Sequence, residues 1–250
     1  FLRVQQIDKF RAEGLLLTQN TMAAKFSNCR QLIRRTLHDN AELREDENIQ
    51  KVLEVLKEGI DKVYEAESIE EIVGIEGFCA KNYFSIFNKL NKKVDFEFQL
   101  RTKHPPLDPV NALLSFIYTL ATNEVAAALE TVGLDSYIGY CHTLRSGRSS
   151  LACDLVEEIR CIVERFVITL LNLKIVGEKD FEQKISGAVW LNEDGRRKVL
   201  SKWQEKKRST MTHPYLKQKI PRGLLPYVQS NLLAKYVRGE ISTYPSFLLK

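Results

Sequence analysis

Residues 68–84 read Ser-Ile-Glu-Glu-Ile-Val-Gly-Ile-Glu-Gly-Phe-Cys-Ala-Lys-Asn-Tyr-Phe, and both the start and the interior of this stretch predict a helix. Ser68 and Glu71 have the spacing of a capping box, in which each side chain bonds to the backbone amide of the other residue. Apolar residues then recur every three or four positions, which is the period of one helical face. This face consists of Ile69, Ile72, Val73, Cys79, Ala80, Tyr83 and Phe87. We therefore expect a helix from Ser68 to about Asn91.

The same helical period runs through most of the remaining sequence. No proline occurs before Pro105, and glycine is sparse there, so helix breakers are few. Asp108-Pro109 is a typical helix start, because an N-cap residue is followed by a proline in the first turn. Further helices are predicted near residues 15–46, 49–66, 109–131, 150–173, 180–208 and 222–239. No strand–turn–strand pattern occurs, so the predicted fold class is all-α.

Composition indicates a globular chain. Of the 250 residues, 44% are hydrophobic and 28% are charged, which are ordinary globular values. No uninterrupted apolar stretch reaches about 18 residues, so we expect no membrane segment. The five cysteines are odd in number and form no C-x-x-C pair. That pattern favours a reducing, cytoplasmic location over a disulfide framework or a structural zinc site.

Positive charge is concentrated in one segment. The formal net charge is +5, but residues 194–222 hold ten basic and two acidic residues, a net of +8, so the remainder carries −3. The basic residues of the predicted helix in this tract are Arg196, Arg197, Lys198, Lys202, Lys206, Lys207 and Arg208. Such a tract suggests an anionic partner such as nucleic acid, although a solvated helix face has the same pattern. Trp203, within it, is either a core anchor, the commoner role, or a platform for a base.

Carboxylates and one histidine form the candidate chemical site. Glu76 lies on the apolar face of its helix, where a carboxylate is costly unless it is paired, hydrogen-bonded or bound to a metal. His142 lies in a loop before the next-but-one helix, with Arg145 and Arg148 close behind it. It fits a metal ligand or a general acid, and equally a hydrogen-bonded loop histidine.

The helix after this loop begins with an acidic cluster. Asp154 is spaced i,i+3 from Glu157 and i,i+4 from Glu158, so either pair can face one point. Acids early in a helix also complement its dipole without any further function, and periodicity does not separate Glu157 from Glu158. A histidine with carboxylates suits manganese or magnesium, and a divalent cation beside arginines suits phosphodiester chemistry.

Four ordered motifs, spread over about residues 12–250, resemble one family. They are Glu76-Gly77-x-x-Ala80-x-x-Tyr83-Phe84, Arg101-x-Lys103-x-Pro105-Pro106-x-Asp108-Pro109-Val110-Asn111-Ala112-Leu113-Leu114-Ser115, Gly139-x-x-His142-Thr143 with Ser150-Leu151-x-x-Asp154-Leu155-x-Glu157, and a tail that includes His213-Pro214, Gly223-Leu224-Leu225-Pro226 and Arg238-Gly239. The chain is similar to the CRISPR-associated endonuclease/integrase of the adaptation module, the universal first Cas protein, and most of all to its subtype I-C branch.

The resemblance implies an all-helical catalytic domain at residues 12–250. Residues 1–11 would be the remnant of a linker from an N-terminal β-rich domain that this chain lacks, which puts dimerisation and integration by the chain alone in doubt. In the family, a glutamate, a histidine and an acidic residue hold Mn²⁺ or Mg²⁺, and these positions match Glu76, His142 and Glu157. Asp154 matches a further acidic position that supports catalysis. Asn111 and Ser115 match a helix packed beside the site.

The resemblance also implies the reaction and the partners. A 3′-hydroxyl of a short foreign DNA attacks a phosphodiester of the CRISPR array, and nuclease activity is the same reaction with water. Arg145, Arg148 and the basic tract would contact double-stranded DNA. The family protein is a homodimer that assembles with a small ferredoxin-like second Cas protein.

Two alternatives remain at the level of sequence. One is a non-catalytic helical DNA-binding scaffold in which the basic tract binds and the acids are structural. The other is a helical interaction domain that binds no nucleic acid. Binding of a divalent metal would exclude the scaffold, and DNA binding that weakens with salt would exclude the interaction domain.

Overall fold

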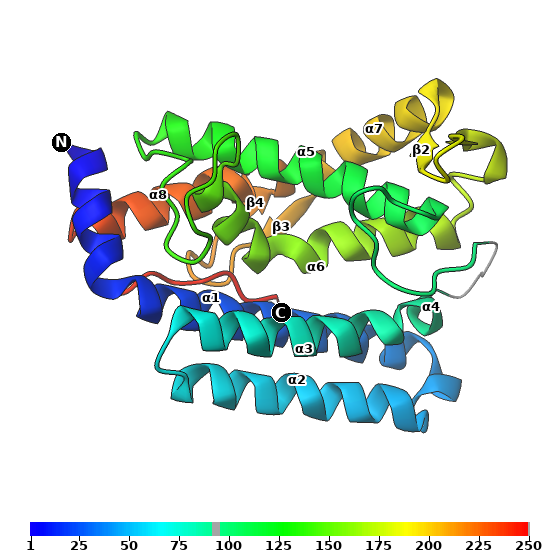
Figure 1. The fold of residues 1–250 in the computed structure, drawn as a ribbon, viewed down its shortest axis with the longest axis horizontal. Coiled ribbons are helices and arrows are strands. Elements are labelled where there is room, and N and C mark those ends of the chain that lie inside the picture. The colour runs from blue at the N-terminus through cyan, green and yellow to red at the C-terminus, as the bar shows by residue number, and fades with distance from the viewer. Residues whose placement is uncertain (92–95, 250) are drawn as a thin grey trace.

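The computed structural model describes residues 1–91 and 96–249, and in this part the predicted all-α class is confirmed (Figure 1). The helices are α1 (Leu2–Asp39), α2 (Glu47–Glu65), α3 (Ile69–Ser85), α4 (Phe87–Leu90), α5 (Pro109–Thr131), α6 (Ser150–Asn172), α7 (Glu193–Arg208) and α8 (Leu225–Val237). Short 3-10 turns, η1 (Ala41–Leu43), η2 (Glu178–Asp180) and η3 (Arg222–Leu224), join some of them.

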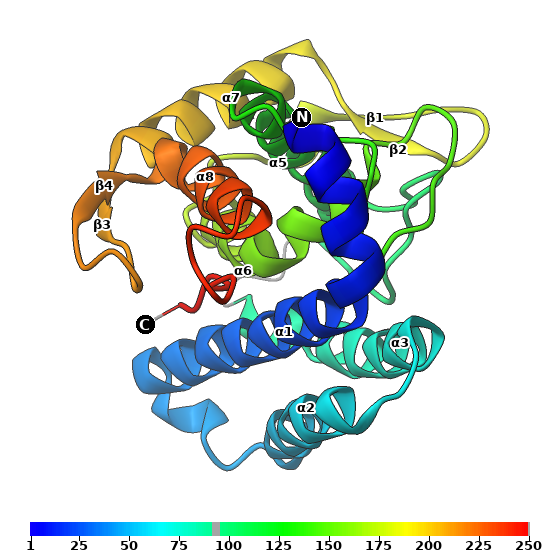
Figure 2. The same cartoon turned by 90° about the vertical axis from the view of Figure 1, so that its left-hand side faces the viewer.

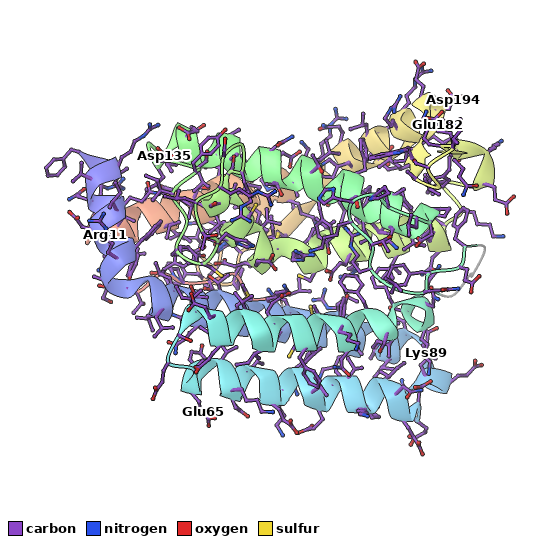
Figure 3. All side chains as sticks on the ribbon, in the orientation of Figure 1. Arg11, Glu65, Lys89, Asp135, Glu182 and Asp194 are labelled. Carbon is purple, nitrogen blue, oxygen red and sulfur yellow. The ribbon has the colours of Figure 1, made fainter. Side chains whose placement is uncertain are left out.

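Helix α1 is the central element of the fold. It packs against α2 and α3 on one side and against α6 and α8 on the other. Figure 2 shows these two helical layers below and above α1. At one end of the lower layer, Lys89 (labelled in Figure 3) pairs with Asp46 at 2.6 Å, and Asp46 caps α2 by accepting from the amide of Ile49. Side chains from distant parts of the sequence therefore meet along α1.

The first residues of the chain are helical. Residues 1–11 were expected to be the remnant of a linker; in the structure α1 begins at Leu2, so residues 2–11 form its first turns. Gln6 is buried, and its side-chain amide donates to the carbonyls of Asp135 and Ile138. The helix bends beyond Arg11 (Figure 3). In the next turns Thr18 donates to the carbonyl of Gly14, and such back-bonding bends helices.

Two short hairpins contradict the expectation that no strand–turn–strand unit occurs. Strand β1 (Phe181–Gln183) pairs with β2 (Val189–Leu191), with Phe181 opposite Leu191. The predicted helix at 180–208 is therefore only α7. Strand β3 (Thr210–Thr212) pairs with β4 (Lys219–Pro221). Three-residue strands are too short to show an alternating pattern in the sequence, which explains the wrong prediction.

The other helix predictions differ mainly at their ends. Helix α5 agrees with its prediction, and Asp108 caps it by accepting from the amide of Asn111 at 2.8 Å. The helix expected at 68–91 stops at Ser85 and resumes as the short α4. Ser149 precedes α6, but its side chain makes no capping hydrogen bond.

Helix α5 is long and apolar enough to cross a membrane when judged by length and composition alone. In the fold it packs against α6 and α8, with Leu113, Ile117 and Leu129 fully buried. The apolar character of α5 is thus used inside the helical core.

Candidate active site

Three helices bring charged side chains to one point. The ammonium of Lys25, on α1, lies 2.5 Å from Oε1 of Glu76 on α3 and 2.5 Å from Oε2 of Glu157 on α6. The side chains of Lys25 and Glu157 are 7% and 8% exposed, and that of Glu76 is 27% exposed. Glu76 is therefore a paired carboxylate, and its partner is a lysine of another helix. Lys25 was not among the predicted site residues.

Arg160 provides a second buried positive charge. It lies one turn after Glu157 on α6, donates to its Oε1 at 2.9 Å, and stacks over the ring of Tyr118 at 4.3 Å. Burial alone would raise the pKa of Glu157, but Arg160 and Lys25 outweigh it and hold this pKa at about 2. Burial lowers the pKa of Lys25, while Glu157 and Glu76 raise it by more, so Lys25 is charged. The centre is thus a network of ionised groups.

His142 is held by Asp154. Its Nδ1 lies 2.6 Å from Oδ1 of Asp154, which also accepts from the backbone amide of His142 at 2.9 Å. The other carboxylate oxygen accepts from the amides of Tyr140 and Cys141, at 2.7 and 3.1 Å. A hydrogen on Nδ1 leaves Nε2 as the acceptor nitrogen, and within residues 1–91 and 96–249 no hydrogen bond engages Nε2. This carboxylate–histidine arrangement is typical of histidines that bind metals.

Asp154 itself is a positioning residue. It is fully buried, and its hydrogen-bond partners within the described residues all belong to the loop that carries His142. Gly139 is required for this arrangement, because a Cβ there would lie 2.5 Å from Oδ2 of Asp154. Asp154 was predicted as a catalytic residue, and the structure places it behind His142, where it supports that side chain.

Glu158 faces away from this centre. It accepts hydrogen bonds from the amide of Phe247 at 2.8 Å, from Gln229 at 2.9 Å and from the hydroxyl of Tyr244 at 3.0 Å. Burial raises its pKa to about 7 despite these donors. The structure therefore distinguishes the two glutamates that periodicity left equivalent. Glu157 contacts Lys25 and Arg160, whereas Glu158 binds the C-terminal segment, residues 244–247, through Tyr244 and Phe247.

A cavity of about 570 Å³ opens beside the centre, lined among others by Lys25, Glu76, Arg101, Lys103 and Arg160. Burial and the neighbouring Arg160 lower the pKa of Lys103, as expected for cations gathered in a pocket. The excess of basic groups makes the cavity suited to an anion.

The motif residues around position 111 orient one of these groups. Asn111 and Ser115 accept from the guanidinium of Arg101 at 2.8 and 3.1 Å. Asn111 also donates to the carbonyl of Leu100 at 2.8 Å. Arg101 was not predicted as a site residue, although it stands in a quoted motif.

The carboxylates of Glu76 and Glu157 and the imidazole of His142 fit a divalent cation, provided that the ammonium of Lys25 moves away from the two carboxylates. In the described residues, the group whose ligand atoms lie within 4.8 Å of one another is Cys141, His142 and Asp154. Burial raises the pKa of the Cys141 thiol to about 12, and Asp154 is saturated by amides, so this group is a poor site. Glu76 and Glu157 instead converge on one cation, Lys25, and Oε2 of Glu157 is a buried oxygen that accepts no well-aligned hydrogen bond. His142 offers a free imidazole nitrogen.

The predicted DNA contacts next to His142 lie at the surface. Arg145 is exposed, and Arg148 is half-buried because it donates back to the carbonyl and hydroxyl of Thr143. Arg148 therefore shapes its own loop in this structure.

The basic residues of the tract from Arg196 to Arg208 lie on α7, but acidic side chains of the same chain neutralise much of their charge. Arg197 pairs with Glu193, Lys198 with Asp180, Lys202 with Glu205, and Lys207 with Glu124. Arg196 donates to the carbonyl of Leu191, and Arg208 is exposed. Trp203 is buried, packs against Phe166 at 5.0 Å and donates to Glu124. The interpretation of Trp203 as a core anchor is confirmed.

Lys206 belongs to a different group of cations. It lies near Arg222 and Arg165, and Arg165 in turn lies near Arg35; after burial, these like charges lower the pKa values of Lys206, Arg222 and Arg35. In the described part of the chain, these four side chains form no ion pair with an acid. Of the four, Lys206 was predicted as a DNA contact and Arg222 lies in the basic tract of residues 194–222, whereas Arg35 and Arg165 lie on α1 and α6, outside that tract.

Comparison with known proteins identifies the family. Residues 1–205 match the sequence model of the family described as CRISPR associated protein Cas1. The chain is 39% identical over 247 residues to a CRISPR-associated endonuclease Cas1 from Leptospira interrogans serogroup Icterohaemorrhagiae serovar Lai (strain 56601), covering 98% of this chain and 96% of the relative. A Cas1 endonuclease of Moorella thermoacetica (strain ATCC 39073 / JCM 9320) is 37% identical, with 94% and 69% covered. The chain therefore belongs to the Cas1 family.

Solved structures have the same fold. A Cas1 protein from Thermotoga maritima superposes with a TM-score of 0.81 at 24% identity, covering 96% of this chain and 70% of that one. A casposase bound to its integration product has a TM-score of 0.86 at 23% identity, with 98% and 68% covered. A chain of a Cas6-RT-Cas1–Cas2 complex has a TM-score of 0.84 at 25% identity, with 100% and 27% covered.

Proposed function

We propose that this Cas1-family protein is a divalent-metal-dependent DNA endonuclease and integrase. It would insert short foreign DNA into a CRISPR array by attack of a 3′-hydroxyl on a phosphodiester, and its motifs favour the subtype I-C branch. The observation that carries the proposal is the convergence of Glu76 and Glu157 on one cation position, beside a basic cavity. The relatives named as endonucleases support the same reaction class.

Glu76, Glu157 and the Nε2 of His142 would hold Mn²⁺ or Mg²⁺. When bound, such an ion polarises the phosphoryl oxygen and stabilises charge on the attacking and leaving oxygens. Oxygen and imidazole ligands match the preferences of both ions.

The protein's own residues prepare this site. Asp154 fixes the tautomer and the orientation of His142. Arg160 and Lys25 together keep Glu157 ionised at neutral pH, because their combined effect on its pKa outweighs that of burial. Arg101, held by Asn111 and Ser115, and Lys103 would position the phosphodiester in the cavity.

Double-stranded DNA and a second Cas protein are the proposed partners. Neighbours of the same fold are a casposase with its integration product and a Cas1–Cas2 complex. By this analogy we extend the proposal to a ferredoxin-like Cas2 partner and a homodimer. The five free thiols, four of them buried, support a cytoplasmic location.

The test is manganese-dependent strand transfer with the single variants Glu76→Ala, His142→Ala and Glu157→Ala. Each is expected to abolish transfer of a labelled 3′ end while DNA binding remains. Glu158→Gln is the matched control on the same helix, and it is expected to keep most activity because Glu158 faces the C-terminal segment. Transfer that survives all three alanine changes would refute the assignment.

A DNA-binding scaffold without chemistry remains the second candidate. The observation that favours it is the group Arg35, Arg165, Lys206 and Arg222, whose charges no acid of the described residues neutralises. Calorimetry with MnCl₂ discriminates the two functions, because a scaffold has no reason to bind the ion.

A further inference from the structure

The ammonium of Lys25 occupies the position on which the two proposed carboxylate ligands converge. It lies 2.5 Å from one oxygen of each, and both contacts cross between helices, from α1 to α3 and from α1 to α6. With Arg160, it compensates the negative charges of Glu76 and Glu157, while Glu164 adds a further carboxylate 3.9 Å from Arg160. Nothing in the family comparison or in the sequence motifs points to this residue.

From this geometry we infer that Lys25 is a resident counter-cation of the metal site, which a divalent ion must displace before it can bind Glu76 and Glu157 together. The inference rests on the proposed metal-dependent function and adds a residue that regulates metal loading. The same two oxygens serve Lys25 and the ion in turn, so the two cations compete.

Electrostatics make simultaneous occupancy unfavourable. A divalent ion on Glu76 and Glu157 would lie against the Lys25 ammonium in a region where charges are poorly screened. Conversely, without any cation between them, two carboxylates at a buried point would lose their compensation, which is costly. A lysine at this place therefore keeps the ligands together and ionised until the ion arrives.

The two basic residues of the network differ in their freedom to move. Arg160 stacks on Tyr118 and bonds to Glu157, so its planar group is fixed. Lys25 has a flexible four-carbon stem and lines the cavity of about 570 Å³, which offers it space on the side of Arg101 and Lys103. Displacement would thus move a positive charge from the metal ligands into the anion-binding cavity.

The test is a calorimetric titration of the full chain with MnCl₂, comparing the wild type with Lys25→Met and Lys103→Met. Removal of the competitor is expected to tighten Mn²⁺ binding by Lys25→Met about tenfold or more, as for any ligand freed from a competing state. Lys103→Met removes one positive charge from the same cavity but no contact with Glu76 or Glu157, so its effect should be several-fold smaller. If the wild type binds Mn²⁺ and Lys25→Met binds it equally or more weakly, the inference about Lys25 is wrong while the proposed metal-dependent function stands.

Thermal unfolding gives a second readout that does not depend on activity. Without metal, Lys25→Met should unfold at a lower temperature than the wild type, and saturating MnCl₂ should raise its Tm by more than it raises that of the wild type. Lys25→Arg covers the case in which the methionine variant does not fold. It keeps a counter-cation that is harder to displace, so it should bind Mn²⁺ no more tightly than the wild type. Tighter binding by Lys25→Arg overturns the inference, and no Mn²⁺ binding by any variant or the wild type overturns the proposed function with it.

Discussion

Replacing Asp154 with asparagine removes one acceptor from the loop that carries His142. Each oxygen of Asp154 now accepts two hydrogen bonds, one pair from Tyr140 and Cys141 and the other from the amide and ring of His142. An amide NH₂ in place of either oxygen faces donors, so at least one backbone amide loses its acceptor in a buried place. Each lost bond to a charged group costs about 1.5 to 3 kcal/mol. For a chain of this size, the loss of one such bond corresponds to a fall in Tm of roughly 3 °C or more.

The same change affects the imidazole. If the new NH₂ takes the place of Oδ1, Nδ1 of His142 becomes the acceptor and the hydrogen moves to Nε2, the nitrogen proposed to bind the metal. Loss of such a supporting carboxylate typically lowers metal affinity about 10- to 100-fold.

The assay for Asp154→Asn combines thermal unfolding with titration of MnCl₂. Asp135→Asn is the matched control, because Asp135 also bonds to a loop amide, that of Tyr137 at 2.9 Å, but its side chain is partly exposed. The control should change neither Tm nor affinity appreciably. A wild-type Tm and Mn²⁺ affinity for Asp154→Asn would refute the role derived for this carboxylate.

Two further predictions concern stability and DNA binding. Because burial raises the pKa of Glu158 to about 7, above the usual value near 4.5, the native state holds a proton that the unfolded state releases between these pH values. As the pH rises through this window, the free energy of unfolding should therefore fall by up to about 1.4 kcal/mol per pH unit. Urea titrations at pH 5 to 8 measure this dependence, and Glu158→Gln should remove it. Charge reversal of Arg165 and Arg222, which have no acidic partner in the described residues, should weaken binding of a labelled DNA duplex and reduce its salt dependence. The same reversal of Arg197 and Lys202, both paired with acids on α7, should have less effect in the same anisotropy titrations, and equal effects would contradict the distinction.

Local signals in the sequence located most helices, although α1 begins at Leu2, well before residue 15, and the helix predicted at 180–208 is only α7. The pair Asp108-Pro109 starts α5 as predicted, because capping depends on residues within one turn. The face predicted for α3 holds at Ile72, Cys79 and Tyr83, whereas Val73 is half exposed. The two hairpins were missed, because each strand has only three residues and their pairing depends on packing against the rest of the fold.

The site could be predicted only in part, because its charges meet through tertiary structure. Lys25 precedes Glu76 by 51 positions on another helix, and nothing in its local sequence distinguishes it from other lysines. The acids that neutralise α7, such as Asp180 and Glu124, also come from other elements. Periodicity alone left Glu157 and Glu158 equivalent, and the family resemblance favoured Glu157. In the structure their contacts separate them, because Glu157 pairs with Lys25 of α1 and Glu158 accepts from the amide of Phe247.

The most direct test of the central claim is the location of Mn²⁺ by anomalous scattering in crystals of the protein. We expect one ion bound by Glu76, Glu157 and Nε2 of His142, with the ammonium of Lys25 moved into the cavity. An ion bound at Cys141 and Asp154, or a crystal in saturating MnCl₂ in which Lys25 still bridges the two glutamates, would contradict it.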